Sequence, residues 1–166
     1  MVTRRRKATE VEASALASGI RLRIIRLTYA EALTNKELAQ RLGKDPATTL
    51  HHVRKLVDAG FLTPEPARRG ARGAKEIPYR STGLSWQLDI GQDPAVGNAI
   101  FEAFLAEVAD VGPENMAQWR LVAQVPPERL DEFKQRMQTV LNEFSTEPVD
   151  EDAERTAVYV ALYPSR

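Results

Sequence analysis

The chain has 166 residues, of which 43% are hydrophobic and 28% are charged, and its formal net charge is zero. This composition predicts an ordinary globular protein with room for one domain and an appended element, or for two small domains. Cysteine is absent, which excludes disulfides, thiolate metal ligands and cysteine nucleophiles.

No stretch of the sequence is apolar over the roughly 18 residues that a transmembrane helix needs. The basic N-terminal stretch is not followed by the apolar region of a signal peptide. We therefore expect a cytoplasmic protein without membrane contact.

The zero net charge hides two halves of opposite sign. Residues 1–90 carry 17 Lys and Arg against 9 Asp and Glu, whereas residues 91–166 carry 6 against 14. The net charges are therefore +8 and −8. A basic half is suited to binding a polyanion and an acidic half is not, so the two halves are expected to have different roles.

The first predicted element is an amphipathic helix within residues 10–33, in which Leu16, Ile20, Ile24 and Leu27 follow helical spacing. A second helix is predicted to begin at Thr34, because Thr34 and Glu37 have the spacing of a capping box. Gly43 is the residue expected to end this helix.

A third helix is predicted from Pro46 to Ala59, with Asp45 as its N-cap and Pro46 in its first turn. A helical projection places an apolar set on the side of the core: Leu50, Val53, Leu56 and Val57. The opposite, polar and cationic side carries Thr48, His51, His52 and Lys55, with Ala47 and Arg54 beside them. Two helices joined by a short turn at Gly43 predict a helix-turn-helix, whose polar face has side chains able to bond base edges and phosphates.

Residues 61–82 are predicted to form a hairpin, or wing, because extended apolar pieces flank a tip rich in Gly and Arg. Pro64, Pro66 and Pro78 restrict its strands to edge pairing. The tip carries four cations suited to phosphate or minor-groove contact: Arg68, Arg69, Arg72 and Lys75.

The acidic half begins with Asp93 and Pro94, which predict the start of a helix. This helix has more apolar surface than it would need if it were half exposed on a small domain. We therefore interpret it as a dimerisation helix that packs against the first helix and its symmetry mate. The proposed interface residues are Val96, Ile100, Phe101, Phe104, Leu105 and Val108.

The rest of the acidic half is predicted to contain strands at residues 119–125 and 155–164 and a helix at residues 127–144. The stretch around Trp86 is a candidate third strand, and the pairing of these strands stays open.

The two histidines do not form a metal site. His51 and His52 lie about 100° apart on a helix, and the sequence has no further His or Cys to complete a ligand set. Phosphate-binding, hydrolase and metalloprotease motifs are also absent from the sequence. We therefore expect no cofactor, no bound metal and no enzymatic activity.

From about Leu16 to Tyr79, roughly two fifths of the chain, the sequence resembles the winged helix-turn-helix of the ArsR family of bacterial transcriptional regulators. The matching residues are Leu16, Arg21, Leu22, Ile24, Ile25, Leu27, Thr34, Glu37, Leu38, Ala39, Leu42, Gly43, His52, Val53, Leu56, Ala59, Gly60, Phe61 and Leu62. The resemblance implies a homodimeric regulator of double-stranded DNA, usually a repressor, that acts on a palindromic operator. The Cys-containing metal box of the family's metal sensors is missing, which points to its metal-independent members, and Leu50 stands where a small hydroxyl residue is frequent.

The sequence thus predicts an α+β protein with a basic tail (residues 1–10), a winged helix-turn-helix domain (11–90) and a C-terminal dimerisation or regulatory region (91–166). Candidates for base contact are Thr48, Thr49, His51, His52 and Lys55. Candidates for backbone and wing contact are Arg21, Lys36, Lys44, Arg54, Arg68, Arg69, Arg72 and Lys75.

Several alternatives remain open. His52 is alternatively a packing residue at the boundary between helix and wing. Residues 4–7 form either a solubilising tail or an arm that follows the DNA backbone. The acidic loop 147–154 is a solvated connection or an autoinhibitory partner of the wing. The chain as a whole is alternatively a protein-interaction module, or a regulator that binds a small-molecule effector between the Phe101 helix and the Trp119 strand.

Overall fold

The computed structural model describes residues 5–70, 73–148, 150 and 152–165. The chain divides into two units, Arg4–Asp110 and Val111–Arg166, and each is described by itself. None of the helices within the described ranges is both long and apolar enough to cross a membrane.

The N-terminal unit begins with two helices where the sequence predicted one. α1 (Glu10–Leu16) and α2 (Gly19–Ala30) are separated by Ala17 and Ser18, and Ser18 is extended with φ −159° and ψ 121°. The apolar spacing continues across this break, since Leu16 and Ile24 are both buried. Periodicity alone therefore failed to reveal the break, and the prediction of a single helix was wrong.

The helix-turn-helix is formed by α3 (Asn35–Leu42) and α4 (Pro46–Asp58). The predicted capping box is confirmed, because the Thr34 side chain accepts from the Glu37 amide and the Glu37 carboxylate accepts from the Thr34 amide. Gly43 ends α3 with φ 61°, in the left-handed region that glycine adopts without strain. The Asp45 side chain accepts from the amides of Ala47 and Thr48, as predicted for the N-cap of α4.

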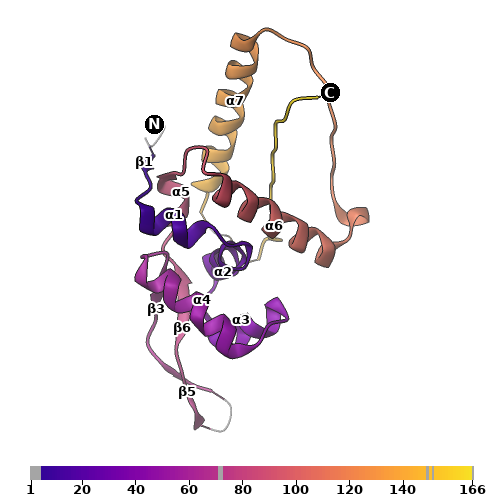
Figure 1. Cartoon of the computed structure of the whole chain (residues 1–166). Coiled ribbons are helices and arrows are strands. Elements are labelled where there is room, and N and C mark those ends of the chain that lie inside the picture. The colour runs from indigo at the N-terminus through magenta and orange to yellow at the C-terminus, as the bar shows by residue number, and fades with distance from the viewer. Residues whose placement is uncertain (1–4, 71–72, 149, 151, 166) are drawn as a thin grey trace. The chain divides into compact units, whose positions relative to one another are not determined.

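The predicted wing is confirmed. Two antiparallel strands leave the helices and lead to a tip hairpin at the far end of the unit (Figure 1). Thr63 pairs with Arg80 at the base of the wing, and Arg69 pairs with Lys75 at its tip. A short strand before α3 adds to the base sheet, whose order is β2-β6-β3. The strands are β2 (Leu33–Thr34), β3 (Leu62–Pro64), β4 (Arg68–Arg69), β5 (Lys75–Glu76) and β6 (Pro78–Ser81).

The N-terminal segment from residue 5 onward belongs to the fold, contrary to the prediction of a separate tail. β1 (Arg6–Lys7) pairs in parallel with β7 (Leu88–Asp89). Arg5 lies over the ring of Trp86, 4.6 Å from its centroid. Trp86 itself lies in the short helix α5 (Leu84–Gln87). The strand that was a candidate in this stretch is therefore limited to Leu88–Asp89, and it pairs with β1 rather than with a C-terminal strand.

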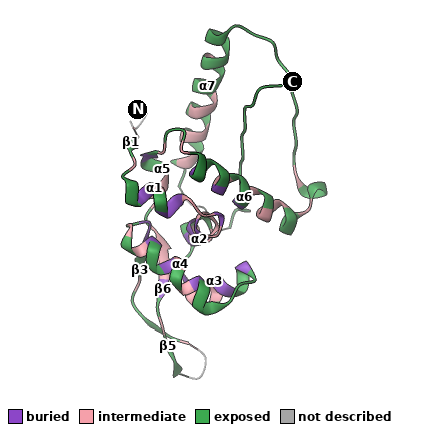
Figure 2. Ribbon diagram, viewed as in Figure 1, coloured by how far each residue is buried: buried purple, intermediate pink, exposed green. Residues whose placement is uncertain are grey.

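One hydrophobic core holds the N-terminal unit together (Figure 2). It collects apolar side chains from α1 to α4, from the wing base and from the helix that follows β7. Its largest fully buried members are Phe61, Ile24, Leu33, Leu38, Leu56, Leu88, Val53 and Val96.

The helix after β7 is α6 (Pro94–Val111), and Asp93 caps it as predicted by accepting from the Ala95 amide. α6 crosses α2 closely, because a Cβ atom at Gly19 would lie 3.1 Å from the Cβ atom of Glu102. Two ion pairs add to this contact, Arg23 with Asp110 and Arg26 with Glu107. α6 is thus fixed against α2 of its own chain.

The second unit contains the short 3₁₀ helix η2 (Pro113–Asn115) and the predicted helix, observed as α7 (Pro127–Ser145). The strands predicted at residues 119–125 and 155–164 are absent, because both segments are irregular. Alternating apolar residues favour a strand, but a strand forms only when its backbone has a hydrogen-bonded neighbour. Neither segment has one within this chain's described residues.

Candidate nucleic-acid interface

The inner face of α4 fixes how the helix is presented. Val53 and Leu56 are fully buried, whereas Leu50 and Val57 are only partly buried. The third fully buried residue of this face is Thr49, whose hydroxyl donates to the Asp45 carbonyl oxygen at 2.9 Å. Thr49 therefore faces the core, and its prediction as a base contact was wrong.

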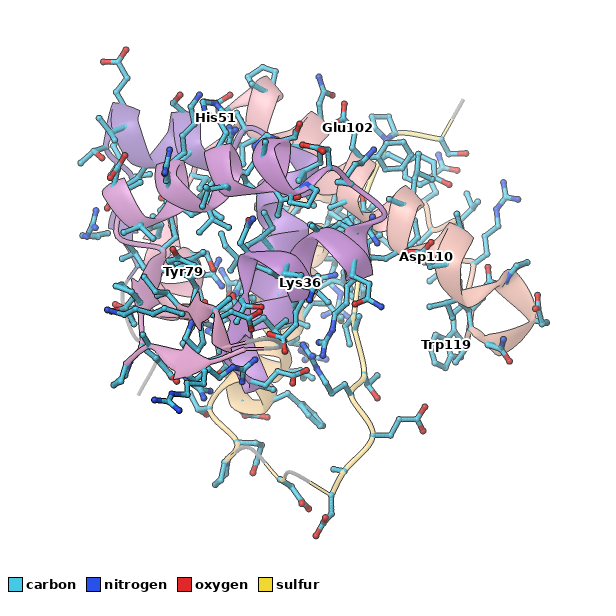
Figure 3. The ribbon with its side chains drawn as sticks, turned by 90° about the horizontal axis from the view of Figure 1, so that it is seen from below. Lys36, His51, Tyr79, Glu102, Asp110 and Trp119 are labelled. Carbon is cyan, nitrogen blue, oxygen red and sulfur yellow. The ribbon has the colours of Figure 1, made fainter. Side chains whose placement is uncertain are left out.

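The outer face of α4 is polar, cationic and open to solvent. Thr48, His51, Arg54 and Lys55 are all exposed, and Figure 3 labels His51 on this helix. Within the described residues, neither Arg54 nor Lys55 has an ion-pair partner. Unpaired cations beside short hydroxyl and imidazole side chains are the groups that bind phosphates and base edges.

His52 lies between this face and the core, in contact with Arg21. The Arg21 Nη1 atom is 3.5 Å from His52 Nδ1. Burial lowers the pKa of His52, and the positive charges of Arg21, His51 and Lys55 lower it further. His52 is therefore held toward its neutral form, and its ring is partly buried.

Arg21 is not the exposed phosphate ligand that the sequence predicted. It is 8% exposed, and its guanidinium donates to the carbonyl oxygens of Ala15 at 2.5 Å and Ser14 at 2.9 Å. These carbonyls belong to the last turn of α1, so Arg21 satisfies acceptors that a helix end leaves unpaired. Burial lowers the pKa of this guanidinium.

The start of α3 lies beside the start of α4. Asn35 Nδ2 donates to the Pro46 carbonyl oxygen at 2.8 Å and so ties the two helix N-termini together. Lys36, labelled in Figure 3, is exposed on α3, and Lys44 is exposed in the turn. Both predicted phosphate-contact lysines are therefore accessible.

The wing is joined to the helix-turn-helix by one of its own predicted DNA contacts. Arg68 Nη2 lies 2.6 Å from Glu37 Oε1, so the residue that caps α3 also binds the wing. Hydrogen bonds from Thr34 lower the pKa of Glu37, and Arg68 adds to this effect. Arg69 and Lys75 are exposed near the tip, while Arg72 lies outside the described residues.

Two positioning residues at the base of the wing were missed by the sequence reasoning. Arg80 Nε lies 2.5 Å from Glu65 Oε1, and Arg80 Nη1 donates to the Ala30 carbonyl oxygen at the end of α2. A long-range pair of this kind leaves no local pattern in a sequence. A second missed feature did leave one, because Thr9 and Glu12 have capping-box spacing and form that box.

The predicted dimer face of α6 is divided between the core and the surface. Val96 is fully buried in its own chain, so its prediction as an interface residue was wrong. Ile100, Phe104 and Val108 are partly buried. Phe101 and Leu105 are each 49% exposed on the side of α6 away from the core. Together with Val111 at the end of the helix, which is 51% exposed, these two form the apolar surface that α6 still presents.

Metal-ligating side chains do not gather in groups of three or more anywhere within the described ranges. The groups that the site does bring together are cations, hydroxyls and imidazoles on α4, flanked by the wing.

A family model described as a helix-turn-helix domain matches residues 16–65. Together with the wing, this match shows that the N-terminal unit is a winged helix-turn-helix domain, as the sequence predicted. No curated protein matches the sequence significantly.

The chain is also similar to solved structures of low sequence identity. Reduced HlyU from Vibrio cholerae is 19% identical, with 57% of this chain and 84% of that chain covered and a TM-score of 0.35. The homodimeric winged helix-turn-helix DNA-binding domain of Mb0332 from Mycobacterium bovis is 24% identical, with 66% and 85% covered and a TM-score of 0.36. The transcriptional regulator Tm0710 from Thermotoga maritima is 18% identical, with 77% and 79% covered and a TM-score of 0.35.

Proposed function

We propose that this protein is a cytoplasmic, DNA-binding transcriptional regulator that acts as a homodimer on a palindromic operator. The observation that carries the proposal is the outer face of α4, where Thr48, His51 and Lys55 are exposed while Val53 and Leu56 anchor the helix in the core. A helix anchored on one side and polar on the other is suited to entering the major groove.

The flanking cations extend this surface along the DNA backbone. Lys36 and Lys44 are exposed near the N-terminus of α4, and Arg69 and Lys75 are exposed on the wing. In the proposed complex α4 reads base edges, Arg54 and the two lysines bind phosphates, and the wing contacts the adjacent backbone or minor groove. The charge distribution supports this orientation, since residues 1–90 carry a net charge of +8.

The homodimer is proposed from α6. Phe101 and Leu105 leave an apolar strip on a helix that is otherwise fixed to α2. Packing this strip against the same strip of a second copy gives a two-fold interface. Such a dimer presents two copies of α4 to half-sites about 34–36 Å apart, one turn of DNA.

We further propose that the protein is a repressor of the metal-independent ArsR type. The sequence pattern from Leu16 to Leu62 supports this assignment, and the absence of cysteine removes the ligands of the family's cysteine-containing metal box. The effector that we propose for such a regulator is a small molecule.

The proposal is tested by selecting bound sequences from a random DNA pool and measuring affinity for the selected site by fluorescence anisotropy. We expect a palindromic consensus, and an affinity that falls about 10³- to 10⁵-fold between 50 and 200 mM salt, as for about 6 to 10 phosphate contacts. Recovery of no consensus together with salt-independent binding would contradict the proposal.

A matched pair of variants assigns the surface. Arg54→Ala on the outer face of α4 should reduce affinity for the selected site and the steepness of its salt dependence. Arg41→Ala is the control, because Arg41 is an exposed arginine of α3 that already pairs with Glu31 at 2.6 Å. Equal effects of the two changes would argue against α4 as the recognition helix.

The alternative function, a protein-interaction module, is tested on the wing. Unchanged DNA binding after joint replacement of Arg68, Arg69 and Arg72 by alanine would favour a wing that docks a protein.

A further inference from the structure

The second unit, Val111–Arg166, lacks a hydrophobic core. None of its described residues is buried, and Figure 2 shows α7 in the colours of exposed and intermediate residues. Most of its large apolar side chains beyond α6 are instead exposed by 36% to 90%. These exposed side chains are Trp119, Leu121, Val122, Val125, Leu130, Phe133, Val140, Phe144, Val158, Tyr159, Val160, Leu162 and Tyr163.

The apolar side of α7 is one part of this surface. Leu130, Phe133, Val140 and Phe144 repeat at helical spacing, and Phe144 is 75% exposed. A helix of this kind gains most of its stability from packing its apolar side, because isolated helices are marginal in water. α7 therefore requires an apolar surface to cover it.

The two irregular segments form the other part. Trp119, Leu121 and Val125 occupy alternate positions in the first, and Val158, Val160 and Leu162 do so in the second. Both have the pattern of a strand that covers a core on one face. Their backbones have no strand neighbour within the described residues, so they require a partner that supplies hydrogen bonds as well as apolar contact.

A second copy of this chain meets both requirements. It carries the same strand-like segments and the same apolar side of α7, so a two-fold axis matches each set with its equivalent. Thirteen large apolar side chains at these exposures offer on the order of 1,000 Å², comparable to the roughly 800 Å² that each partner buries in a stable interface. Nucleic acid is disfavoured as the occupant, because residues 111–166 carry 6 Lys and Arg against 10 Asp and Glu.

The α6 helix also makes a second copy the favoured partner. α6 ends at Val111, where the second unit begins. If α6 pairs through Phe101 and Leu105, every dimer brings two copies of the second unit together at an effective concentration on the order of millimolar. Pairing of the two units then becomes an intramolecular step, which costs less association entropy.

We propose that residues 111–166 complete their fold only with the same residues of a second copy, forming one shared core in which segments 119–125 and 158–163 pair as strands beneath α7. The inference rests on the homodimer of the proposed function and adds that the acidic unit is an obligatory part of the dimer.

Trp119 provides the first test, because the chain has only two tryptophans and Trp119, labelled in Figure 3, is 90% exposed. In the full-length Trp86→Phe variant, Trp119 is the sole reporter. As concentration rises and sedimentation shows the dimer forming, we expect a blue shift of its emission and an approximately threefold or greater fall in acrylamide quenching. An exposed Trp119 in a fully formed dimer would overturn the inference.

A matched pair of substitutions provides the second test. Val158→Lys places a charge in the proposed shared core and should raise the dimer dissociation constant at least tenfold. Val11→Lys is the control, because it introduces the same change on α1 at a position that is 66% exposed, against 56% for Val158. It should change the dimer dissociation constant less than about twofold.

The outcomes separate this inference from the proposed function. A chain that binds its operator and remains a monomer at every concentration overturns both the homodimer and the shared core. A dimer that forms normally with Val158→Lys and dissociates with Phe101→Glu overturns the shared core alone and leaves the α6 dimer in place.

Discussion

The guanidinium of Arg21 lies 3.5 Å from Nδ1 of His52 and connects three helices. Arg21 is on α2, its other nitrogens donate to carbonyl oxygens at the end of α1, and His52 belongs to α4. Because a guanidinium can only donate, His52 Nδ1 is the acceptor and Nε2 carries the proton in the neutral ring. A proton added to His52 would place a second positive charge against Arg21.

Replacing His52 by Gln should reduce the acid sensitivity of folding near neutral pH. Burial and the neighbouring cations lower the pKa of His52 in the folded chain from its ordinary 6.5. The unfolded chain then binds more protons below about pH 6.5, so stability falls as pH falls from there toward the folded-state pKa. Urea denaturation between pH 7.5 and 5.5 should show this loss in the wild type and a smaller loss in His52→Gln.

The control for this experiment is His51→Gln, the same change at an exposed position one residue away. This variant should keep the greater part of the wild-type loss of stability between pH 7.5 and 5.5. Glu12 and Glu37 do not titrate in this pH window, because the pKa values of both are lowered from 4.5. The pKa of Glu12 is lowered to about 2, mainly by its hydrogen bond with Arg6. Parallel stability curves for the wild type and His52→Gln would contradict the assignment.

Replacement by valine should change DNA recognition at Thr48 and stability at its neighbour Thr49. Thr48 is exposed on the outer face of α4, so Thr48→Val should leave the free energy of unfolding within about 0.5 kcal/mol of wild type. On DNA it should change the preferred base in each half-site, since a good base contact contributes about 1–3 kcal/mol of discrimination.

Thr49→Val alters a buried hydroxyl instead. It should leave the DNA sequence selected from a random pool unchanged and change only the urea midpoint of unfolding. Selection experiments with both variants check the pair, and a new consensus for Thr49→Val would show that α4 rotates when it binds DNA.

Glu37 should contribute more to stability than its partner Arg68. Its carboxylate completes the capping box of α3 and also binds the wing, so Glu37→Ala removes both interactions. We expect a loss of about 1–2 kcal/mol for Glu37→Ala, as for loss of a helix cap. Arg68→Ala breaks only an ion pair in which both side chains are at least 39% exposed, and should cost less than about 1 kcal/mol.

Thermal or urea unfolding of the two variants and of Thr34→Ala checks this order. Thr34→Ala should resemble Glu37→Ala, because it breaks the same box from the other side. A greater loss for Arg68→Ala than for Glu37→Ala would mean that docking of the wing, rather than the cap, stabilises this region.

The local features of the winged domain were predictable from sequence because they depend on neighbouring residues. The Thr34 and Glu37 box, the Gly43 turn and the Asp45 cap each act within a few positions, and all three were confirmed. The break before Gly19 was missed, since the apolar spacing continues across it from Leu16 to Ile24.

Side-chain roles that depend on which face of a helix meets the core were the ones predicted wrongly. Arg21 is a cation and Thr49 a hydroxyl residue, which favours the surface for both. Each is buried because the structure supplies a partner: carbonyls of α1 for Arg21 and the Asp45 carbonyl for Thr49. The strands predicted at residues 119–125 and 155–164 failed for a related reason, because a strand's partner is not encoded in its own alternation.

Gly19 should tolerate no side chain, because α6 crosses α2 at this position. A Cβ atom there would lie 3.1 Å from the Glu102 Cβ atom and 3.2 Å from the Ala103 amide nitrogen, and the second of these is backbone. Gly19→Val should therefore push α6 away from α2 and cost about 1–3 kcal/mol of stability. Gly97→Ala is the matched control on α6, since nothing lies within 4 Å of its Cβ position, and it should stabilise the helix by about 0.5–1 kcal/mol. Urea unfolding of both variants decides between close packing and a loose contact, because a loosely held α6 would accept the valine without loss.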